Sequence, residues 1–410
     1  MIRQTPAYRR FPAAGAAGYN SRDVAVARLA AFSTDNAMAR KQSLKSTGKL
    51  VVLDHESRIL ADNPFNDPTL RKLAVWLPPG YDDGTARGKS SGRGRRYPVL
   101  WDLVGYTGSG LAHVGWRPFD ENVPERAARL MHERRMGPCI IVFPDCFNCL
   151  GGNQYINSSA LGAYADYLTQ ELVPFVDREF RTLASRDHRG CFGKSSGGYG
   201  AMIHGMKYAK YWGAIANHSG DAYFDYCYLT DWPRTLNELD RYRRPRRQPG
   251  RIDVVKDADG TGEGYDDGRI RRFLDAIWSK EKLNDAEGHA LMEVCMAASY
   301  DPDPDAPLGF RLPIDLETGQ LLPARWKQWQ KHDPIHLVGK YRDNLRTLRG
   351  IYMDCGWRDQ YHLHFGARIL SRELAVNGIK HTYEEFDDTH SSVDYRMDVS
   401  LPFLYRALKP

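Results

Sequence analysis

The chain has 410 residues, of which 42% are hydrophobic and 26% are charged, which is ordinary for a soluble globular protein. The net charge of +6 is small for this length and does not by itself indicate an acidic partner such as nucleic acid. No stretch approaches the roughly 20 consecutive apolar residues of a membrane helix, and the first residues lack the apolar core of a secretory signal. We therefore expect no membrane partner.

The chain beyond residue 48 alternates between strand-like and helix-like patterns. Residues 1–48 lack periodicity, and we interpret them as a flexible tail. The predicted strands are Lys49–Leu53, Arg71–Leu77, Tyr97–Val104, Pro138–Pro144, Arg189–Gly193, Trp212–Asn217, Arg349–Asp354 and Lys380–Phe386. The predicted helices are Ala160–Arg181 with a kink at Pro174, Tyr199–Tyr211, Phe365–Asn377 closed by Gly378, and Ser400–Leu408. Such alternation requires crossover connections, so we expect an α/β fold with a mostly parallel sheet flanked by helices.

A long interruption separates the two parts of this α/β core, which we place at residues 49–220 and 341–410. Residues 221–340 contain few apolar residues and only short helical patches, so we expect an inserted cap rather than a second autonomous domain. The basic run at 241–251 lacks aromatic residues at stacking spacing, so we interpret it as a solvated loop and expect no nucleic-acid partner. A Gly-, Ser- and Arg-rich stretch at 85–96 is expected to form another loop.

The cysteines bear on the cellular compartment. Their number, seven, is odd and they are scattered, which favours reduced thiols and a cytoplasmic location over a disulfide framework. Cys146 and Cys149 form a C-x-x-C motif, but a zinc site would need a second matched pair. A redox motif would begin a helix, whereas Gly151 and Gly152 follow here. We interpret these cysteines as structural or incidental.

The strongest chemical signal is Gly193-Lys194-Ser195-Ser196-Gly197, which fits the pattern G-x-S-x-G. A nucleophile elbow carries this pattern where a strand turns abruptly into a helix, and here a predicted strand precedes it and a predicted helix follows. The glycines are needed because side chains two before and two after the serine would collide in so tight a turn. Ser196 also carries a hydroxyl, but only Ser195 has glycines at both positions. Ser195 is therefore the predicted nucleophile.

A serine nucleophile needs a histidine base and a carboxylate that orients the base. In this fold the chain order is serine, acid, histidine, each on a loop after a strand. His390, in the loop FDDTHSS, is the histidine that follows the last predicted strand. Asp354 and Asp359 compete for the role of acid. We favour Asp359, because it lies in the loop where its side chain can reach His390, whereas Asp354 ends the strand RGIYMD.

The oxyanion hole is expected to consist of two backbone N–H groups. Ser196 follows the nucleophile directly and supplies one of them. The loop at 103–110 follows an early buried strand, and Gly105 lets the backbone turn so that the N–H of Tyr106 faces the site.

The insertion is expected to lie over Ser195, because ligands in open α/β sheets bind beyond the carboxyl ends of the strands. Aromatic residues near the two ends of the insertion suit a mostly apolar pocket: Tyr223, Phe224, Tyr226, Tyr228, Trp232, Trp326 and Trp329. The other interpretation of these side chains is that they only pack the cap against the core.

Six segments of the chain together resemble the putative-esterase family, which contains esterase D (S-formylglutathione hydrolase), enterochelin esterases, feruloyl esterases and mycolyltransferases. They are LPPGYDD (77–83), RYPVLWDLVGYTG (96–108), GGNQYINS (151–158), GKSSGGYGAM (193–202), DCGWRD (354–359) and FDDTH (386–390). The resemblance implies the α/β-hydrolase fold, with Ser195 as nucleophile, Asp359 as acid and His390 as base. It also implies backbone donors at Tyr106 and Ser196.

The sequence therefore predicts a serine hydrolase that cleaves carboxylic esters by ping-pong acyl transfer, with thioesters as a further substrate class left open. It implies no metal and no organic cofactor, and the expected partner is a small-molecule ester. Two alternatives stay open: an acyltransferase that uses another alcohol in place of water, and a non-catalytic binding protein of the same fold. The chain has Val104-Gly105 where many relatives have His-Gly, and its insertion is longer than a simple family member needs. No relative's substrate is therefore carried over.

Overall fold

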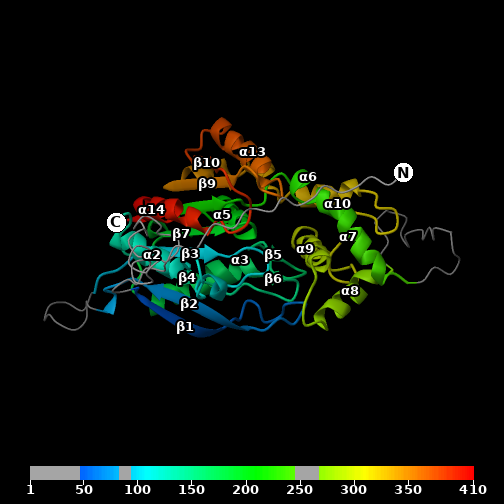
Figure 1. Cartoon of the computed structure of the whole chain (residues 1–410), viewed down its shortest axis with the longest axis horizontal. Coiled ribbons are helices and arrows are strands. Elements are labelled where there is room, and N and C mark those ends of the chain that lie inside the picture. Colours follow the sequence, from blue (N-terminus) through cyan, green and yellow to red (C-terminus); the bar gives the residue numbers. More distant parts are fainter. Residues whose placement is uncertain (1–46, 83–93, 245–266) are drawn as a thin grey trace, which may run out of the picture. The chain divides into compact units, whose positions relative to one another are not determined.

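The computed structural model describes residues 47–82, 94–244 and 267–410 (Figure 1). Nearly all of the predicted tail, most of the loop at 85–96 and much of the basic run at 241–251 lie outside these ranges.

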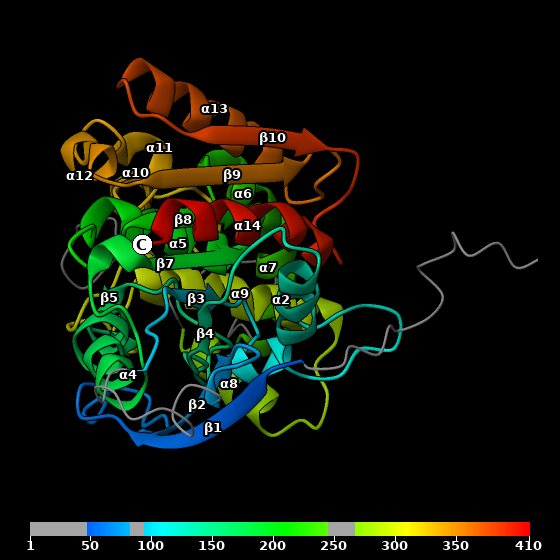
Figure 2. The ribbon, with the colours of Figure 1, turned by 90° about the vertical axis from the view of Figure 1, so that its left-hand side faces the viewer.

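A sheet of eight strands runs through the described part of the chain (Figure 2). Its spatial order is β1-β2-β4-β3-β7-β8-β9-β10. β2 pairs antiparallel with β1 and β4, and the other neighbours are parallel. Each predicted strand overlaps one of these, which confirms the α/β-hydrolase fold. The strands are β1 Lys49–Glu56, β2 Leu70–Leu77, β3 Val99–Leu103, β4 Ile140–Phe143, β7 Arg189–Lys194, β8 Ala214–His218, β9 Gly350–Gly356 and β10 Thr382–Phe386.

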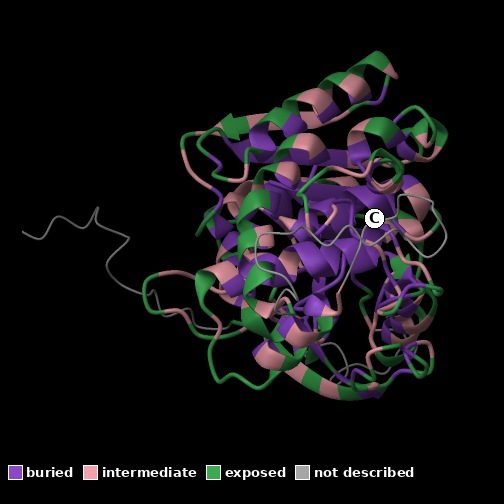
Figure 3. Ribbon diagram, turned by 90° about the vertical axis from the view of Figure 1, so that its right-hand side faces the viewer, coloured by how far each residue is buried: buried purple, intermediate pink, exposed green. Residues whose placement is uncertain are grey.

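Helices cover both faces of the sheet, and each face has its own hydrophobic core. Successive side chains of a strand point to opposite faces. In β3, Trp101 therefore packs into one core and Leu100 into the other. The core that contains Leu100 packs against α2 (Val123–His132) and α14 (Met397–Leu408). The opposite core includes residues of three further helices: α4 (Val173–Glu179), α5 (Ser196–Lys207) and α13 (Leu363–Val376). Figure 3 shows the sheet buried at the centre, with exposed residues on the outer sides of the helices.

One helix prediction needs correction, and a further helix was not predicted. The helix predicted over 160–181 begins only at Tyr164, because a small hairpin of β5 (Asn157–Ser158) and β6 (Gly162–Ala163) occupies its first residues. The helix is also not regular. Its middle, Tyr167–Leu172, is a π-helix that ends just before the predicted kink at Pro174. α2 has no counterpart in the sequence prediction, although Asn122 and Glu125 form a capping box at its N-terminus.

The interruption between β8 and β9 is more helical than its composition suggested. Its longest helix, α9, has 16 residues, and its C-terminal half is buried. Small side chains such as Ala297 and Ala298 let α9 pack in the same core as α5, where Tyr300 meets Tyr199. The helices of this segment are α6 Phe224–Cys227, α7 Trp232–Leu239, α8 Arg269–Trp278, α9 Asp285–Tyr300, α10 Pro323–Gln330, α11 Pro334–Leu337 and α12 Arg342–Arg346. Within the described ranges, no helix is both long and apolar enough to cross a membrane.

Candidate active site

Ser195 lies in the sharp turn between β7 and α5, with φ 59° and ψ −125°. A positive φ is uncommon for a residue with a side chain and marks local strain. The turn is held by hydrogen bonds on both sides of the serine: its N–H donates to the carbonyl of His218 at 3.0 Å, and its carbonyl accepts from Tyr199 at 2.9 Å. This is the strand, turn and helix arrangement that the sequence predicted.

Steric crowding explains the two glycines that flank this turn. A Cβ on Gly197 or on Gly193 would overlap the carbonyl oxygen of Leu103 at the end of β3. The elbow therefore packs directly against the end of β3, and only glycine fits at either position. Gly105 of the following loop also lies close, because a Cβ there would be 3.6 Å from the Cβ of Ser195.

His390 and Asp359 are hydrogen-bonded to each other. The Nδ1 of His390 lies 2.8 Å from Oδ2 of Asp359, and both residues are buried. The other carboxylate oxygen, Oδ1, accepts from the backbone N–H of Tyr361 at 2.9 Å. Gln360 fixes the histidine backbone, since its Oε1 accepts from the N–H of His390 at 3.0 Å. The loops after β9 and β10 are thus joined beside the sheet edge.

The rival carboxylate, Asp354, makes different contacts. Its Oδ1 lies 2.7 Å from Nδ1 of His218, and its Oδ2 accepts from Arg396 at 2.8 Å and from the Tyr352 hydroxyl at 2.9 Å. Burial opposes ionisation of Asp354, but the charges and hydrogen bonds of His218 and Arg396 outweigh it, so its pKa lies below the usual value. Asp354 has no hydrogen bond with His390 within the described residues.

The loop after β3 brings Tyr106 to the same region. The Tyr106 hydroxyl donates to the carbonyl of Leu150 at 2.8 Å, and the N–H of Thr107 donates to Gly151 at 2.7 Å. The hydroxyl of Tyr155 holds the start of the loop through the carbonyl of Val104 at 2.6 Å. Among the hydrogen bonds of the described residues, none uses the backbone N–H of Tyr106.

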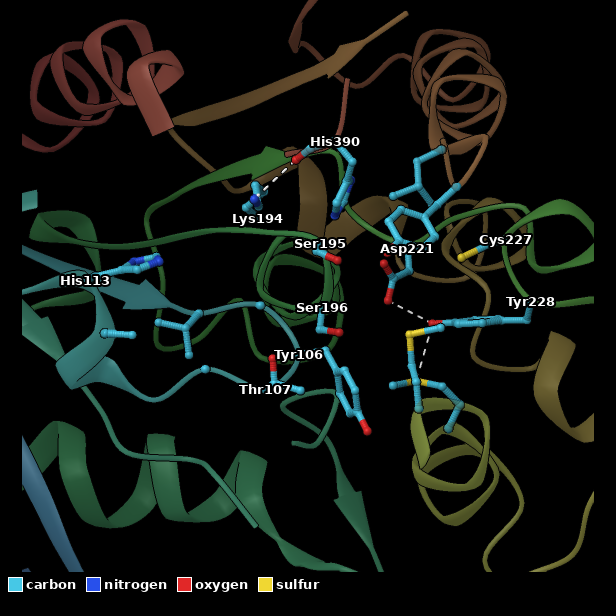
Figure 4. Close-up of a pocket in the computed structure, with 18 residues that line it drawn as sticks. Tyr106, Thr107, His113, Lys194, Ser195, Ser196, Asp221, Cys227, Tyr228 and His390 are labelled. Carbon is cyan, nitrogen blue, oxygen red and sulfur yellow. Dashed lines mark hydrogen bonds between the residues drawn. The ribbon is translucent and has the colours of Figure 1, made fainter. Parts of the chain in front are cut away.

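A cavity of about 480 Å³ contains four of the five predicted site residues on its walls: Ser195, His390, Tyr106 and Ser196. The fifth, Asp359, does not line the cavity and is hydrogen-bonded to His390. Figure 4 shows the imidazole of His390 directed toward Ser195, with Tyr106 and Ser196 on the other side of the serine. Residues of the segment after β8 complete the wall, including Tyr228 of the predicted aromatic set and two methionines of α9, Met292 and Met296.

Two acidic groups of the site were not foreseen from the sequence. Asp221, shortly after β8, lines the cavity and accepts hydrogen bonds from Gln154 and Tyr228. Asp102, inside the buried strand β3, lies 2.7 Å from Nδ1 of His113, which also lines the cavity. Each had a sequence signal. A charged residue within an apolar strand requires a partner, and a carboxylate just past the carboxyl end of a strand belongs at the ligand edge.

No group of three or more His, Cys, Asp or Glu side chains in the described ranges is arranged to hold a metal ion. The cysteines of the C-x-x-C motif are free thiols, and burial raises the pKa of Cys149 to about 12 and that of Cys146 still further. Such thiols stay protonated near neutral pH and are poor nucleophiles and metal ligands.

Comparison with known families assigns the chain. The family described as "Putative esterase" matches residues 68–400, which span the whole sheet except β1. The chain belongs to this esterase family. A curated family relative, Esterase Rv1288 of Mycobacterium tuberculosis, is 33% identical over 136 residues, or 32% of this chain. The match covers 26% of that protein, so the chain spans about a quarter of its length.

Solved structures agree with the fold. A ferulic acid esterase superposes with a TM-score of 0.51 at 17% identity, covering 88% of this esterase-family chain and 99% of the other. The S-formylglutathione hydrolase FrmB of Staphylococcus aureus superposes with a TM-score of 0.50 at 13% identity, covering 87% and 98%. At identities this low, the superpositions show a shared fold alone.

Proposed function

We propose that the chain is a serine hydrolase that cleaves carboxylic esters of small molecules through an acyl-enzyme on Ser195. The observation that carries the proposal is the hydrogen bond between His390 and Asp359 beside a serine held in a strained elbow. His390 would act as the base, Asp359 as its orienting acid, and the backbone N–H groups of Tyr106 and Ser196 as the oxyanion hole.

The acylation step follows from these positions. Nδ1–H of His390 donates to Asp359, which leaves Nε2 free to accept the proton of the Ser195 hydroxyl. The serine Oγ forms a bond to the ester carbonyl carbon, and the carbonyl oxygen becomes an oxyanion that accepts from Tyr106 and Ser196. When the bond from this carbon to the alkoxy oxygen breaks, His390 returns its proton to the leaving alcohol.

Deacylation repeats these steps with water. His390 removes a proton from water, the hydroxide oxygen bonds to the acyl carbon, and the bond to Ser195 Oγ breaks as His390 reprotonates the serine. The carboxylic acid leaves and the enzyme is restored. No step requires a group beyond these side chains, the two backbone donors and water.

The cavity fits a small ester. Its volume of about 480 Å³ lies in the range of small-molecule sites, which are mostly apolar with a few fixed polar groups. Met292 and Met296 supply flexible apolar wall, while Tyr228 and Asp221 supply polar positions.

The test compares Ser195→Ala with its neighbour Ser196→Ala. We expect Ser195→Ala to lower kcat for an activated ester such as 4-nitrophenyl acetate by at least about 1,000-fold. It should also abolish labelling by a fluorophosphonate. Ser196→Ala keeps its backbone N–H, so it should retain most of both. A severe loss in Ser196→Ala with a mild one in Ser195→Ala would refute the assignment. Product analysis with added alcohols would separate hydrolysis from acyl transfer.

A further inference from the structure

Asp221 is a carboxylate built into the wall of the cavity beside the elbow. It is 6% exposed, and Figure 4 shows its side chain between Ser195 and Tyr228. The proposed acyl-transfer chemistry gives it no role, since Asp359 already holds His390. Burial of a carboxylate is unfavourable unless hydrogen bonds or a positive charge compensate for the lost hydration.

A rigid network holds one oxygen of this carboxylate. Oδ2 accepts from Nε2 of Gln154 and from the hydroxyl of Tyr228, each at 2.8 Å. Gln154 also donates to the hydroxyl of Tyr300 at 2.8 Å, and all three partners are buried. These side chains come from three separate segments of the chain, so the position of Asp221 is fixed by the fold rather than by local flexibility.

The other oxygen, Oδ1, has no hydrogen-bond partner among the described residues. Nor does any Lys, Arg or His in the described ranges form an ion pair with Asp221 within 4 Å. Burial raises the pKa of this carboxyl, although the hydrogen bonds from Gln154 and Tyr228 lower it. Because Asp221 lines the cavity, this carboxylate oxygen is in a position to accept a hydrogen bond from a ligand, and hydrogen bonds to a carboxylate are among the stronger ones.

We propose that Oδ1 of Asp221 accepts a hydrogen bond from a hydroxyl group of the substrate, so that the enzyme selects esters with a hydroxyl near the scissile carbonyl. This inference rests on the proposed esterase function, because it places the hydroxyl relative to a carbonyl at Ser195. A site built to receive a donor discriminates against a substrate that lacks it, because the buried acceptor then stays unpaired. An apolar pocket alone would favour the plain ester.

The experiment measures kcat/KM for two matched pairs of esters. One pair carries the hydroxyl on the acyl side, 4-nitrophenyl 3-hydroxybutyrate against 4-nitrophenyl butyrate. The other carries it on the alcohol side, 2-hydroxyethyl butyrate against propyl butyrate. A hydrogen bond to a charged group corresponds to roughly 10- to 100-fold, so we expect that preference for the hydroxyl ester in one pair.

Two variants identify the residue responsible. Asp221→Asn keeps the shape but removes the charge, so the preference should fall to about threefold or less. Asp225→Asn changes a carboxyl of the same segment that does not line the cavity, and the preference should stay as in the wild type. Equal loss for both esters of a pair in Asp221→Asn, with the preference retained, would overturn the inference and point to an effect on the catalytic groups.

If Asp221→Asn does not fold, the kcat/KM values of the wild type for the two ester pairs still test the inference. A preference below twofold in both pairs overturns the inference while leaving the esterase function intact. Failure to turn over any of the four esters, together with no fluorophosphonate labelling of Ser195, would refute the proposed function and the inference with it.

Discussion

Replacing Asp359 by asparagine tests the proposed triad through one hydrogen bond. The Oδ1 position of residue 359 accepts from the backbone N–H of Tyr361, so the asparagine oxygen should take that place. The amide nitrogen would then face Nδ1 of His390, where Oδ2 stands now at 2.8 Å. Since an amide nitrogen only donates, Nδ1 would have to accept, and the histidine proton would move to Nε2.

The expected loss is large because this tautomer cannot accept the serine proton. In triads of this kind the same substitution lowers kcat by about 10,000-fold, or about 5.5 kcal/mol of transition-state stabilisation at 1.36 kcal/mol per factor of ten. The fold should survive, because asparagine has nearly the same volume and keeps the bond to Tyr361. KM should change much less than kcat, since residue 359 does not line the cavity.

The assay is steady-state hydrolysis of 4-nitrophenyl acetate, with melting followed by circular dichroism. A kcat within tenfold of the wild type, in a variant with an unchanged melting curve, would refute the reasoning and remove Asp359 from the triad. A large loss that tracks a lowered melting temperature would show a structural role instead.

Four further substitutions separate effects on stability from effects on selectivity. Asp354→Asn should lower the free energy of unfolding by roughly 1–3 kcal/mol at pH 7, because it removes the charge that faces Arg396, whereas Arg396 keeps its second ion pair with Glu384. The pKa of Asp354 is depressed, so this stabilisation is lost as the pH falls below about 4, and urea unfolding of variant and wild type should converge there. Tyr228→Ala should change the ranking of esters by kcat/KM, whereas Trp232→Ala, which does not line the cavity, should lower only the melting temperature. Gly197→Ala should yield little folded, active enzyme, because its Cβ overlaps β3.

The strands could be predicted because their physical signal is local. A strand buried on both faces is a short apolar run, as in β3 and β4, and the alternation of strands with helices predicts a mostly parallel sheet. α9 shows the limit of this approach. Its buried positions are partly small side chains, Ala297 and Ala298 among them, so a count of large apolar residues underestimates how well it packs. The small hairpin at 157–163 depends on contacts that no local pattern records.

The site also contains residues that have a local sequence signal and residues that have none. The positions of Ser195, His390 and Asp359 in the fold could be predicted because each follows a strand in a fixed order along the chain, and the elbow has its own glycine pattern, whereas their catalytic roles stay a prediction. Gln154 and Asp221 are far apart in sequence and belong to no motif, so only the folded chain shows that they meet. The sequence predicts the same place for Trp232 and Tyr228, because both are aromatic and near each other in the chain, yet of the two only Tyr228 lines the cavity.

The stretch 150–155 connects the loop of Tyr106 with the inserted segment, which matters for exchanging that segment between relatives. On one side it holds the loop of Tyr106, through the carbonyls of Leu150 and Gly151. On the other it is tied to the inserted segment, since Cys295 donates to the carbonyl of Gly152 and Gln154 donates to Tyr300. The loop of Tyr106 and the inserted segment are therefore connected through one short stretch of chain. A chimaera that receives only a relative's insertion would lose the contacts of Gly152 and Gln154 with Cys295 and Tyr300, so the stretch that anchors the loop of Tyr106 should be transferred together with the insertion.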